Sequence, residues 1–151
     1  MDEYPENLND ENIIEIPEVD VSREFAHCNE TLVERFKQLT LDFEAQQPGK
    51  KLIVTCTYRS PKEQKRLYTQ GRFGNPGPIL TYKDGKNSKS RHNVFPSTAL
   101  DVAVIIGGKA VWAEEHFWPL LPLCIKHGLE SGGAWVSFSD WAHIQLKKED
   151  I

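Results

Sequence analysis

Apolar residues recur at three- and four-residue spacing early in the chain. The positions are Phe25, Cys28, Leu32, Val33, Phe36, Leu39 and Phe43. This spacing puts them on one face of a helix, so the pattern predicts a long amphipathic helix over residues 22–47. Ser22 is a suitable N-cap for that helix, and Pro48 with Gly49 would end it.

Four stretches have the composition of strands. Residues 52–58 and 99–106 are rich in β-branched and other apolar side chains. Residues 134–138 and 142–146 are shorter, and we expect them to form a hairpin around a tight turn at residues 139–141. The pattern therefore predicts a small sheet that uses the second half of the chain.

Two further helices are predicted between the strands. Residues 60–63 supply a serine N-cap, a proline at the first helical position and a glutamate at the third, and this helix would stop near Gly71. Residues 112–127 predict another helix, broken by its two prolines, with Gly128 as the C-cap. Residues 72–91 hold several glycines and prolines and form a long predicted loop, which in compact domains is often functional.

The order of these elements is helix, strand, helix, long loop, strand, helix and hairpin. Such an order predicts an α+β fold in which helices pack on a small antiparallel sheet. The length of 151 residues suits one domain, which we place at residues 22–151. Residues 1–21 are acidic and polar, and we expect an extended arm there. Its anchors to the domain would be the apolar side chains of Ile13, Ile14, Ile16 and Val19.

The net charge of −4 is unevenly distributed. The first 20 residues hold eight acidic side chains and no Lys or Arg, which leaves 14 acidic and 18 basic side chains in the rest. A mildly basic body suits an anionic polymer as partner. It carries no dense basic stripe, so we expect no nucleic-acid partner.

Several other classes of protein are also disfavoured. No apolar run approaches the roughly 18 residues of a transmembrane helix, and no signal peptide is visible. We therefore expect a protein made in the cytoplasm, and nothing indicates more than a monomer. The three cysteines lie far apart without a CxxC pair, which disfavours a thiolate zinc site and predicts small buried thiols.

His92, Asp101 and His143 are candidate zinc ligands. Imidazole and carboxylate groups bind zinc well, and three protein ligands leave one position for water, as in catalytic sites. Asp101 lies in an apolar run, where a carboxylate is costly to bury unless it is paired or binds metal. Spacing alone leaves open that His92 is an ordinary loop histidine.

Two further residues could serve chemistry at such a site. Asp140 lies three residues before His143 and could exchange protons with a zinc-bound water, although an Asx turn would explain it equally well. Arg59, at a strand end, could stabilise an oxyanion or bind a carboxylate, or form a surface salt bridge. Trp141 lies beside the candidate site and could line a substrate cleft.

A set of short motifs in fixed order resembles a known family. Across residues 52–146 the chain is similar to the zinc D-Ala-D-Ala carboxypeptidase and L-alanyl-D-glutamate endopeptidase family, which includes VanY-like enzymes and many phage endolysins. Each motif is weak alone, whereas the ordered set is specific. The motifs are Thr57-Tyr58-Arg59-Ser60, Glu63-Gln64, Leu67-Tyr68, Gln70-Gly71-Arg72, Ser90-Arg91-His92, Ala99-Leu100-Asp101, Gly132-Gly133-Ala134-Trp135 and Asp140-Trp141-Ala142-His143.

The resemblance implies a hedgehog/D-Ala-D-Ala-peptidase-like α+β fold and a site for Zn²⁺. It implies that zinc binds three ligands, that one carboxylate is general base and acid, that one arginine stabilises the oxyanion, and that further residues contact the substrate. The zinc ligands would be His92, Asp101 and His143, the general base and acid would be Asp140, and the oxyanion would be stabilised by Arg59. Ser90 and Gln64 would contact the substrate, and Trp141 is added to them because it lies beside the site. Gln64 has a packing role in a helix as its alternative.

This sequence departs from the family pattern at one place. Eight residues without a glycine separate His92 from Asp101, where family members commonly have a shorter gap that includes a glycine. We expect Pro96 to shape a bulged start of the following strand, so that both ligands still face the metal.

The resemblance implies a zinc peptidase that cuts an amide bond in the peptidoglycan stem peptide. We expect an L-Ala-D-Glu-type endopeptidase of the phage endolysin kind, acting on the cell wall once the membrane is breached. A D-Ala-D-Ala carboxypeptidase is the first alternative. A non-catalytic, zinc-containing cell-wall-binding module is the second, and an α+β domain without metal is the third.

Overall fold

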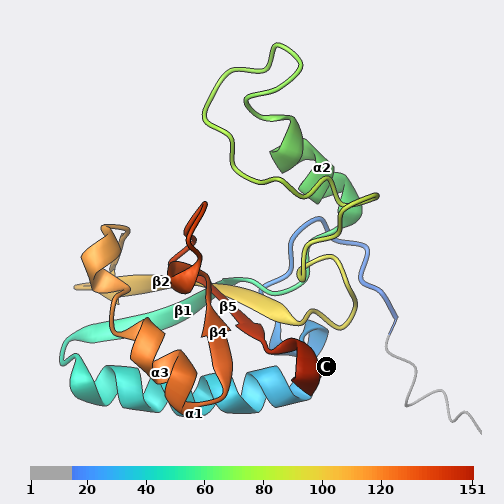
Figure 1. The fold of residues 1–151 in the computed structure, drawn as a ribbon. Coiled ribbons are helices and arrows are strands. Elements are labelled where there is room, and N and C mark those ends of the chain that lie inside the picture. Colours follow the sequence, from blue (N-terminus) through green and yellow to red (C-terminus); the bar gives the residue numbers. More distant parts are fainter. Residues whose placement is uncertain (1–14) are drawn as a thin grey trace, which may run out of the picture.

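The computed structural model describes residues 15–151, which fold around one antiparallel sheet (Figure 1). The sheet has five strands in the order β1-β2-β5-β4, and β3 pairs with β2 outside this path. This confirms the expected α+β class with a small antiparallel sheet. The strands are β1 (Lys50–Cys56), β2 (Ala99–Ile106), β3 (Lys109–Val111), β4 (Leu129–Ser131) and β5 (His143–Leu146).

The longest helix, α1 (Glu30–Gln46), begins later than predicted. Its N-cap is Asn29, whose Oδ1 accepts hydrogen bonds of 2.9 and 3.3 Å from two N–H groups of the first turn. The predicted cap, Ser22, is therefore wrong. Ser22 lies instead in an extended segment, where its N–H donates to the carbonyl oxygen of Tyr58 at 2.8 Å. Between Ser22 and α1 lies only the short 3-10 helix η2 (Phe25–His27).

Helices α1 and α3 (Leu120–Lys126) pack on the same side of the sheet, at the bottom of Figure 1. Their buried side chains meet those of β2, β4 and β5 in one continuous core. Along β2, alternate residues point into this core, because successive side chains of a strand face opposite sides. Fully buried members of the core include Leu32, Leu39, Phe43, Leu100, Val102, Val104, Leu120, Ile144 and Leu146.

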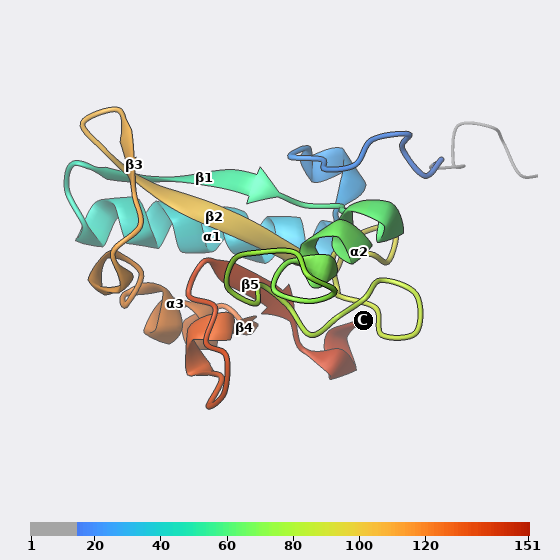
Figure 2. The same cartoon turned by 90° about the horizontal axis from the view of Figure 1, so that it is seen from above.

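The other predicted helices are confirmed. Helix α2 (Pro61–Thr69) begins at its serine cap, because Ser60 Oγ accepts a hydrogen bond of 3.1 Å from the N–H of Glu63. The predicted helix over residues 112–127 is interrupted as expected, forming η3 (Glu114–His116) and then α3. In Figure 2, α2 and the long loop that follows it lie at one end of β2, while the β2–β3 turn lies at the other.

Two parts of the sheet differ from the expectation. Strand β3 follows a tight turn at Gly107 and Gly108, whose φ angles of 56° and 77° favour glycine. The predicted strand over residues 134–138 is wrong. Ala134 is the last residue of the short helix η4 (Gly132–Ala134), and residues 135–138 are irregular chain. The chain turns there because Gly132 lies directly against the backbone of Asp140, where a Cβ atom would collide.

The described part of the acidic arm is held by its backbone. Val21 forms an antiparallel bridge with Arg59, and the N–H of Ser60 donates to the carbonyl oxygen of Asp20 at 2.9 Å. Ile16 and Val19 are 63% and 44% exposed, so these two are not the expected apolar anchors. The other two expected anchors, Ile13 and Ile14, lie outside the described residues.

Two further expectations concern burial and hydropathy. The three cysteines, Cys28, Cys56 and Cys124, are free and buried, as predicted. Burial raises the pKa of Cys28 and of Cys124 to about 12. No helix within residues 15–151 has the length and apolar character needed to cross a bilayer.

Candidate active site

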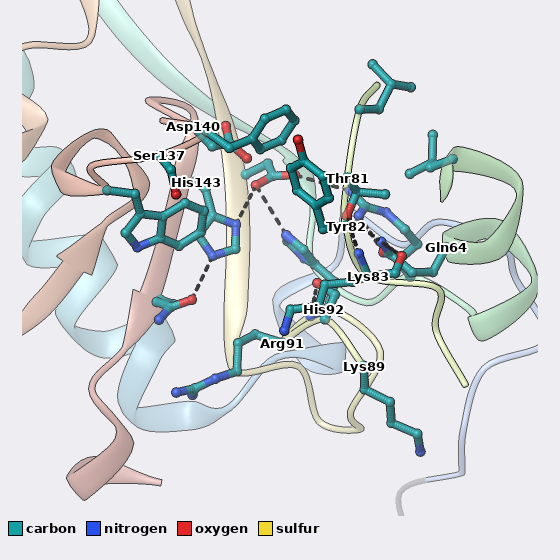
Figure 3. A pocket seen from close by; sticks show the side chains of 18 residues that line it. Gln64, Thr81, Tyr82, Lys83, Lys89, Arg91, His92, Ser137, Asp140 and His143 are labelled. Carbon is teal, nitrogen blue, oxygen red and sulfur yellow. Dashed lines mark hydrogen bonds and ion pairs between the residues drawn. The ribbon is translucent and has the colours of Figure 1, made fainter. Parts of the chain in front are cut away.

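The three predicted metal ligands converge at one point of the sheet. Asp101 on β2 lies opposite His143 on β5, and His92 comes from the loop that precedes β2. Asp101 Oδ1 lies 3.2 Å from His92 Nε2 and 3.2 Å from His143 Nδ1. Figure 3 shows the two imidazole rings turned toward the same oxygen. The fold therefore brings together the three residues that the sequence grouped.

An irregular register places Asp101 beside β1. Val54 pairs with Val102, but the next pair joins Cys56 to Asp101, so β1 contains one additional residue there. Such a bulge re-aims side chains locally and is frequent beside functional sites. Pro96 was expected to shape an irregular approach to β2, and residues 94–96 do form bends there, with a cis peptide bond between Phe95 and Pro96.

The long connection between His92 and Asp101 pairs with the segment before α1. Ser97 donates from its N–H to the carbonyl oxygen of His27 at 3.0 Å and accepts at its own carbonyl from Asn29 N–H at 2.8 Å. At the other end, the carbonyl oxygen of His92 accepts from the N–H of Arg59 at 2.9 Å. The extra residues thus tie the loop to two other segments, and both candidate ligands still face one point.

The outer nitrogens of both imidazoles have hydrogen-bond partners. His92 Nδ1 lies 2.8 Å from the carbonyl oxygen of Thr57, and His143 Nε2 lies 2.9 Å from Gln145 Oε1. Both partners only accept, so these nitrogens carry the protons in neutral rings. The inner nitrogens then present lone pairs to the Asp101 carboxylate. Three acceptors that meet in this way are stabilised by a cation between them, and the donor set of two imidazoles and one carboxylate fits zinc.

Charge and burial act in opposite directions on these groups. Burial alone would lower the pKa of His92, but the negative charge of Asp101 raises that pKa above the ordinary value. Burial alone would likewise raise the pKa of Asp101, but His92 and His143 hold it well below the usual range. The carboxylate therefore stays ionised even though it is enclosed.

Asp140 lies at the same site. One of its carboxylate oxygens and the ligand atoms of Asp101 and His143 all lie within 4.8 Å of one another. Its backbone is fixed, because its N–H donates to the carbonyl oxygen of Gly132 at 2.9 Å. Burial, and then the charge of Asp101, raise the pKa of Asp140 above its ordinary value. A carboxyl group of raised pKa beside the ligands is suited to exchanging protons there.

Arg59 is part of the site and not a surface ion pair. Its Nη2 lies 3.3 Å from Asp101 Oδ2, and its Nη1 donates to Gln64 Oε1 at 2.9 Å. Gln64 is 1% exposed, and its amide nitrogen reaches Thr81 Oγ1 at 3.2 Å and the carbonyl oxygen of Lys83 at 3.0 Å. Gln64 therefore holds Arg59 in place and ties α2 to the long loop, which favours a packing role over direct substrate contact.

A cleft of about 650 Å³ opens over these residues (Figure 3). Ser90 lines it, and Ser90 Oγ accepts from the N–H of His92 at 3.2 Å. Trp135, and not Trp141, lines the cleft. The ring centroids of Trp135 and His143 lie 5.0 Å apart. Trp141 packs on the core beneath Gly133, where a Cβ atom would collide with the indole.

Several residues of the cleft were not singled out from the sequence. Tyr82 and Phe138 meet edge to face with ring centroids 5.3 Å apart, which joins the long loop to the segment after η4. Lys83, Lys89 and Arg91 add positive charge to the lining. Tyr82 and Phe138 had no signal of their own in the sequence. Lys83 and Lys89 lie in the long predicted loop and Arg91 in one of the family motifs, which indicates function but not which side chains reach the cleft.

Comparisons with known proteins agree with this geometry. No family model matches the chain. It is 31% identical over 107 residues to the peptidoglycan L-alanyl-D-glutamate endopeptidase CwlK of Bacillus subtilis (strain 168). This match covers 65% of the chain and 62% of CwlK, so the chain spans less than two thirds of that relative's length.

The fold is also that of a solved endopeptidase. The crystal structure of the Serratia marcescens L-Ala D-Glu endopeptidase ChiX matches with a TM-score of 0.63 and 21% identity, covering 95% of this chain and 97% of ChiX. The chain therefore has the α+β fold of this endopeptidase. Together the two matches support the resemblance to the L-alanyl-D-glutamate endopeptidases that the ordered motifs indicated.

Proposed function

We propose that this chain is a zinc-dependent peptidase of the L-alanyl-D-glutamate endopeptidase family. Its reaction would be hydrolysis of an amide bond in the stem peptide of peptidoglycan. The convergence of His92, Asp101 and His143 beside Asp140 in an open cleft is the observation that carries the proposal. The sequence similarity to CwlK and the fold shared with ChiX support the class of substrate.

The proposed metal ligands are His92 Nε2, His143 Nδ1 and Asp101, with Arg59 and the outer hydrogen bonds holding them in place. Three ligands leave a coordination position for water. When bound at such a site, zinc lowers the pKa of water toward about 7 and polarises a carbonyl oxygen. Cys56 Sγ lies 3.7 Å from His92 Nδ1, on the outer nitrogen, and we assign it to packing.

Two side chains of the cleft would act on the reacting groups. Asp140 accepts a proton from the attacking water and returns it to the departing amine, as general base and then general acid. Arg59 reaches the site from the segment that follows β1. Its guanidinium donates hydrogen bonds to the oxyanion that develops on the scissile carbonyl. Both roles use groups that the fold already holds within the cleft.

The lining of the cleft suits an anionic peptide. Lys83, Lys89 and Arg91 place positive charge in its lining, and the stem peptide carries free carboxylates. Ser90 and the ring of Trp135 supply a hydrogen-bonding group and an apolar wall near the candidate metal site. We propose a monomer that acts on the wall as a phage endolysin does, with the mildly basic body assisting adhesion.

Metal analysis together with digestion of purified peptidoglycan tests the proposal. We expect about one zinc ion per chain, loss of hydrolysis on chelation, and recovery when zinc is added back. Mass analysis should find stem peptides cut between L-Ala and D-Glu. Release of free terminal alanine would instead identify a carboxypeptidase, and zinc binding without any cleavage would identify a binding module. Full hydrolysis by metal-free protein would contradict the proposed chemistry.

A further inference from the structure

A hydrogen-bonded relay runs from Glu130 through Gln145 to the outer nitrogen of His143, and Glu130 has had no role so far. Glu130 on β4 and Gln145 on β5 are direct partners in the strand register. Gln145 Nε2 donates to Glu130 Oε2 at 3.0 Å, and Gln145 Oε1 lies 2.9 Å from His143 Nε2. The relay therefore runs from a carboxylate, through an amide, to a candidate metal ligand.

Hydrogen-bond chemistry gives this relay a direction. An ionised carboxylate only accepts, so Glu130 holds the NH₂ group of Gln145 toward itself. The carbonyl oxygen of Gln145 must then face His143 Nε2, and because that oxygen only accepts, Nε2 carries the proton. In a neutral ring the lone pair is then on Nδ1, the atom that lies 3.2 Å from Asp101 Oδ1.

His92 needs no such device. Its outer nitrogen bonds to the backbone carbonyl of Thr57 at 2.8 Å, and a peptide oxygen cannot become a donor. The amide of Gln145, in contrast, could rotate by half a turn and present its NH₂ group to His143. His143 Nε2 would then accept, the proton would move to Nδ1, and the nitrogen that faces the metal site would be blocked.

We propose that Glu130 and Gln145 are positioning residues that fix the tautomer and orientation of His143, with Glu130 acting only through Gln145. This inference rests on the metal site of the proposed function. Outer hydrogen bonds to metal-bound histidines typically contribute 10- to 100-fold in metal affinity. The two residues are thus expected to set how tightly the site holds zinc.

Competition with a zinc chelator on the full chain measures this effect directly. Glu130→Gln lets the Gln145 amide face either way, so we expect zinc affinity to fall about 10-fold. Gln145→Leu removes the acceptor altogether and should reduce affinity by about 10- to 100-fold. Glu149→Gln is the matched control, because Glu149 is exposed on the last 3-10 helix, and its affinity should stay that of the unmodified chain.

The exchanged pair, E130Q together with Q145E, separates positioning from general support of the fold. The carboxylate introduced on β5 would accept from His143 Nε2 and from the amide introduced on β4, which restores the direction of the relay. We therefore expect affinity to recover to near the unmodified value. Thermal unfolding of the metal-free variants checks that each one folds.

The outcomes distinguish this inference from the function on which it rests. If the unmodified chain binds zinc and Glu130→Gln binds it equally well, the relay is overturned while the metal site stands. An exchanged pair no better than Glu130→Gln would also overturn the relay. A folded unmodified chain without stoichiometric zinc would overturn both proposals.

Discussion

Asp101 connects the two candidate histidine ligands to Arg59, the residue proposed to stabilise the oxyanion, through its two carboxylate oxygens. Oδ1 faces both histidines, and Oδ2 faces Arg59 Nη2 at 3.3 Å. The carboxylate thus lies between the inner nitrogens of the two imidazoles on one side and the guanidinium of Arg59 on the other. Replacing it would disturb the metal site and Arg59 together, so the informative substitutions are those at its neighbours.

Asp140→Asn tests proton transfer without removing a ligand. The amide keeps the size of the carboxylate but cannot accept and return a proton. We expect hydrolysis of peptidoglycan to fall by about 10²- to 10⁴-fold, while zinc content stays near one ion per chain. Metal analysis and a turbidity assay on cell walls measure the two quantities. Unchanged hydrolysis by the zinc-loaded variant would exclude Asp140 as the general base.

Arg59→Lys tests whether the planar guanidinium is needed. Arg59 uses Nη1 for Gln64 and Nη2 for Asp101, and one ammonium group cannot reproduce both contacts. We expect kcat to fall by about 10²- to 10³-fold with a smaller change in KM. The exposed Arg66 offers a control: Arg66→Lys, which alters only a pair with Glu63 on α2, should leave kcat unchanged. Equal kcat for the two variants would place the oxyanion donor elsewhere.

Among the elements, α1 and α3 are joined by a polar link as well as by the core. Asp42 Oδ2 accepts from Lys126 Nζ at 2.8 Å and from His127 Nε2 at 2.7 Å. The hydrogen bonds from Lys126 and His127 lower the pKa of Asp42 below its ordinary value of 3.8. The link therefore contributes stability above that value and loses it as pH falls through the lowered pKa.

Asp42→Asn should make this pH dependence visible. We expect the metal-free variant to unfold at a lower temperature than the metal-free unmodified chain at about pH 5, where the carboxylate is ionised. The difference between the two unfolding temperatures should shrink progressively as pH is lowered below about 3.8. Thermal unfolding followed by circular dichroism at a series of pH values measures it. A difference that widens in acid would contradict the assignment of the shift to Asp42.

The elements that sequence predicted well are those with local signals. Helix α2 carries its own cap and proline at residues 60–61, and β2 is an apolar run interrupted only by Asp101, with the expected bounds. The start of α1 was misplaced because Phe25 and Cys28 continue the helical spacing, although Cys28 instead forms a bridge to Ser97. Strand β4 has only three residues and is defined by pairing with β5, which no local pattern reveals.

The same distinction applies to the site. His92, Asp101 and His143 belong to short ordered motifs, so the resemblance could group them before any geometry was known. Trp135 was within a quoted motif, yet only the packing of Trp141 under Gly133 shows which indole reaches the cleft. Contacts made across strands or between loops, such as those of Gln145 or Tyr82, depend on strand register and on the path of the loops. No local pattern in the sequence therefore predicts them.

At the scale of the whole molecule, the candidate ligands join segments that are distant in sequence. His92 comes from the loop after α2, Asp101 from the centre of the sheet and His143 from the last strand. A metal ion bound by all three would bridge these parts in the folded state. Because the unfolded chain does not hold them together, binding should stabilise the fold.

Zinc should therefore raise the unfolding temperature. At a free zinc concentration of about 100 times the dissociation constant, binding increases the free energy of unfolding by about 2.7 kcal/mol. We expect the unfolding temperature of the zinc-loaded chain to exceed that of the chelated chain, and His92→Ala to abolish the difference. Calorimetry with and without zinc measures it. Equal unfolding temperatures at saturating zinc would contradict a site shared by the three segments.

The burial of the cysteines has a practical consequence for such experiments. None of the three thiols is more than 4% exposed, and burial raises the pKa of Cys28 and Cys124 to about 12. Buried thiols react slowly with oxidants and maleimides. The described surface therefore offers no native thiol for attachment, and a cysteine introduced at the fully exposed Val136 would be the preferred place for a fluorophore. A single label there, on the segment that carries Phe138, could report directly on movement at the rim of the cleft.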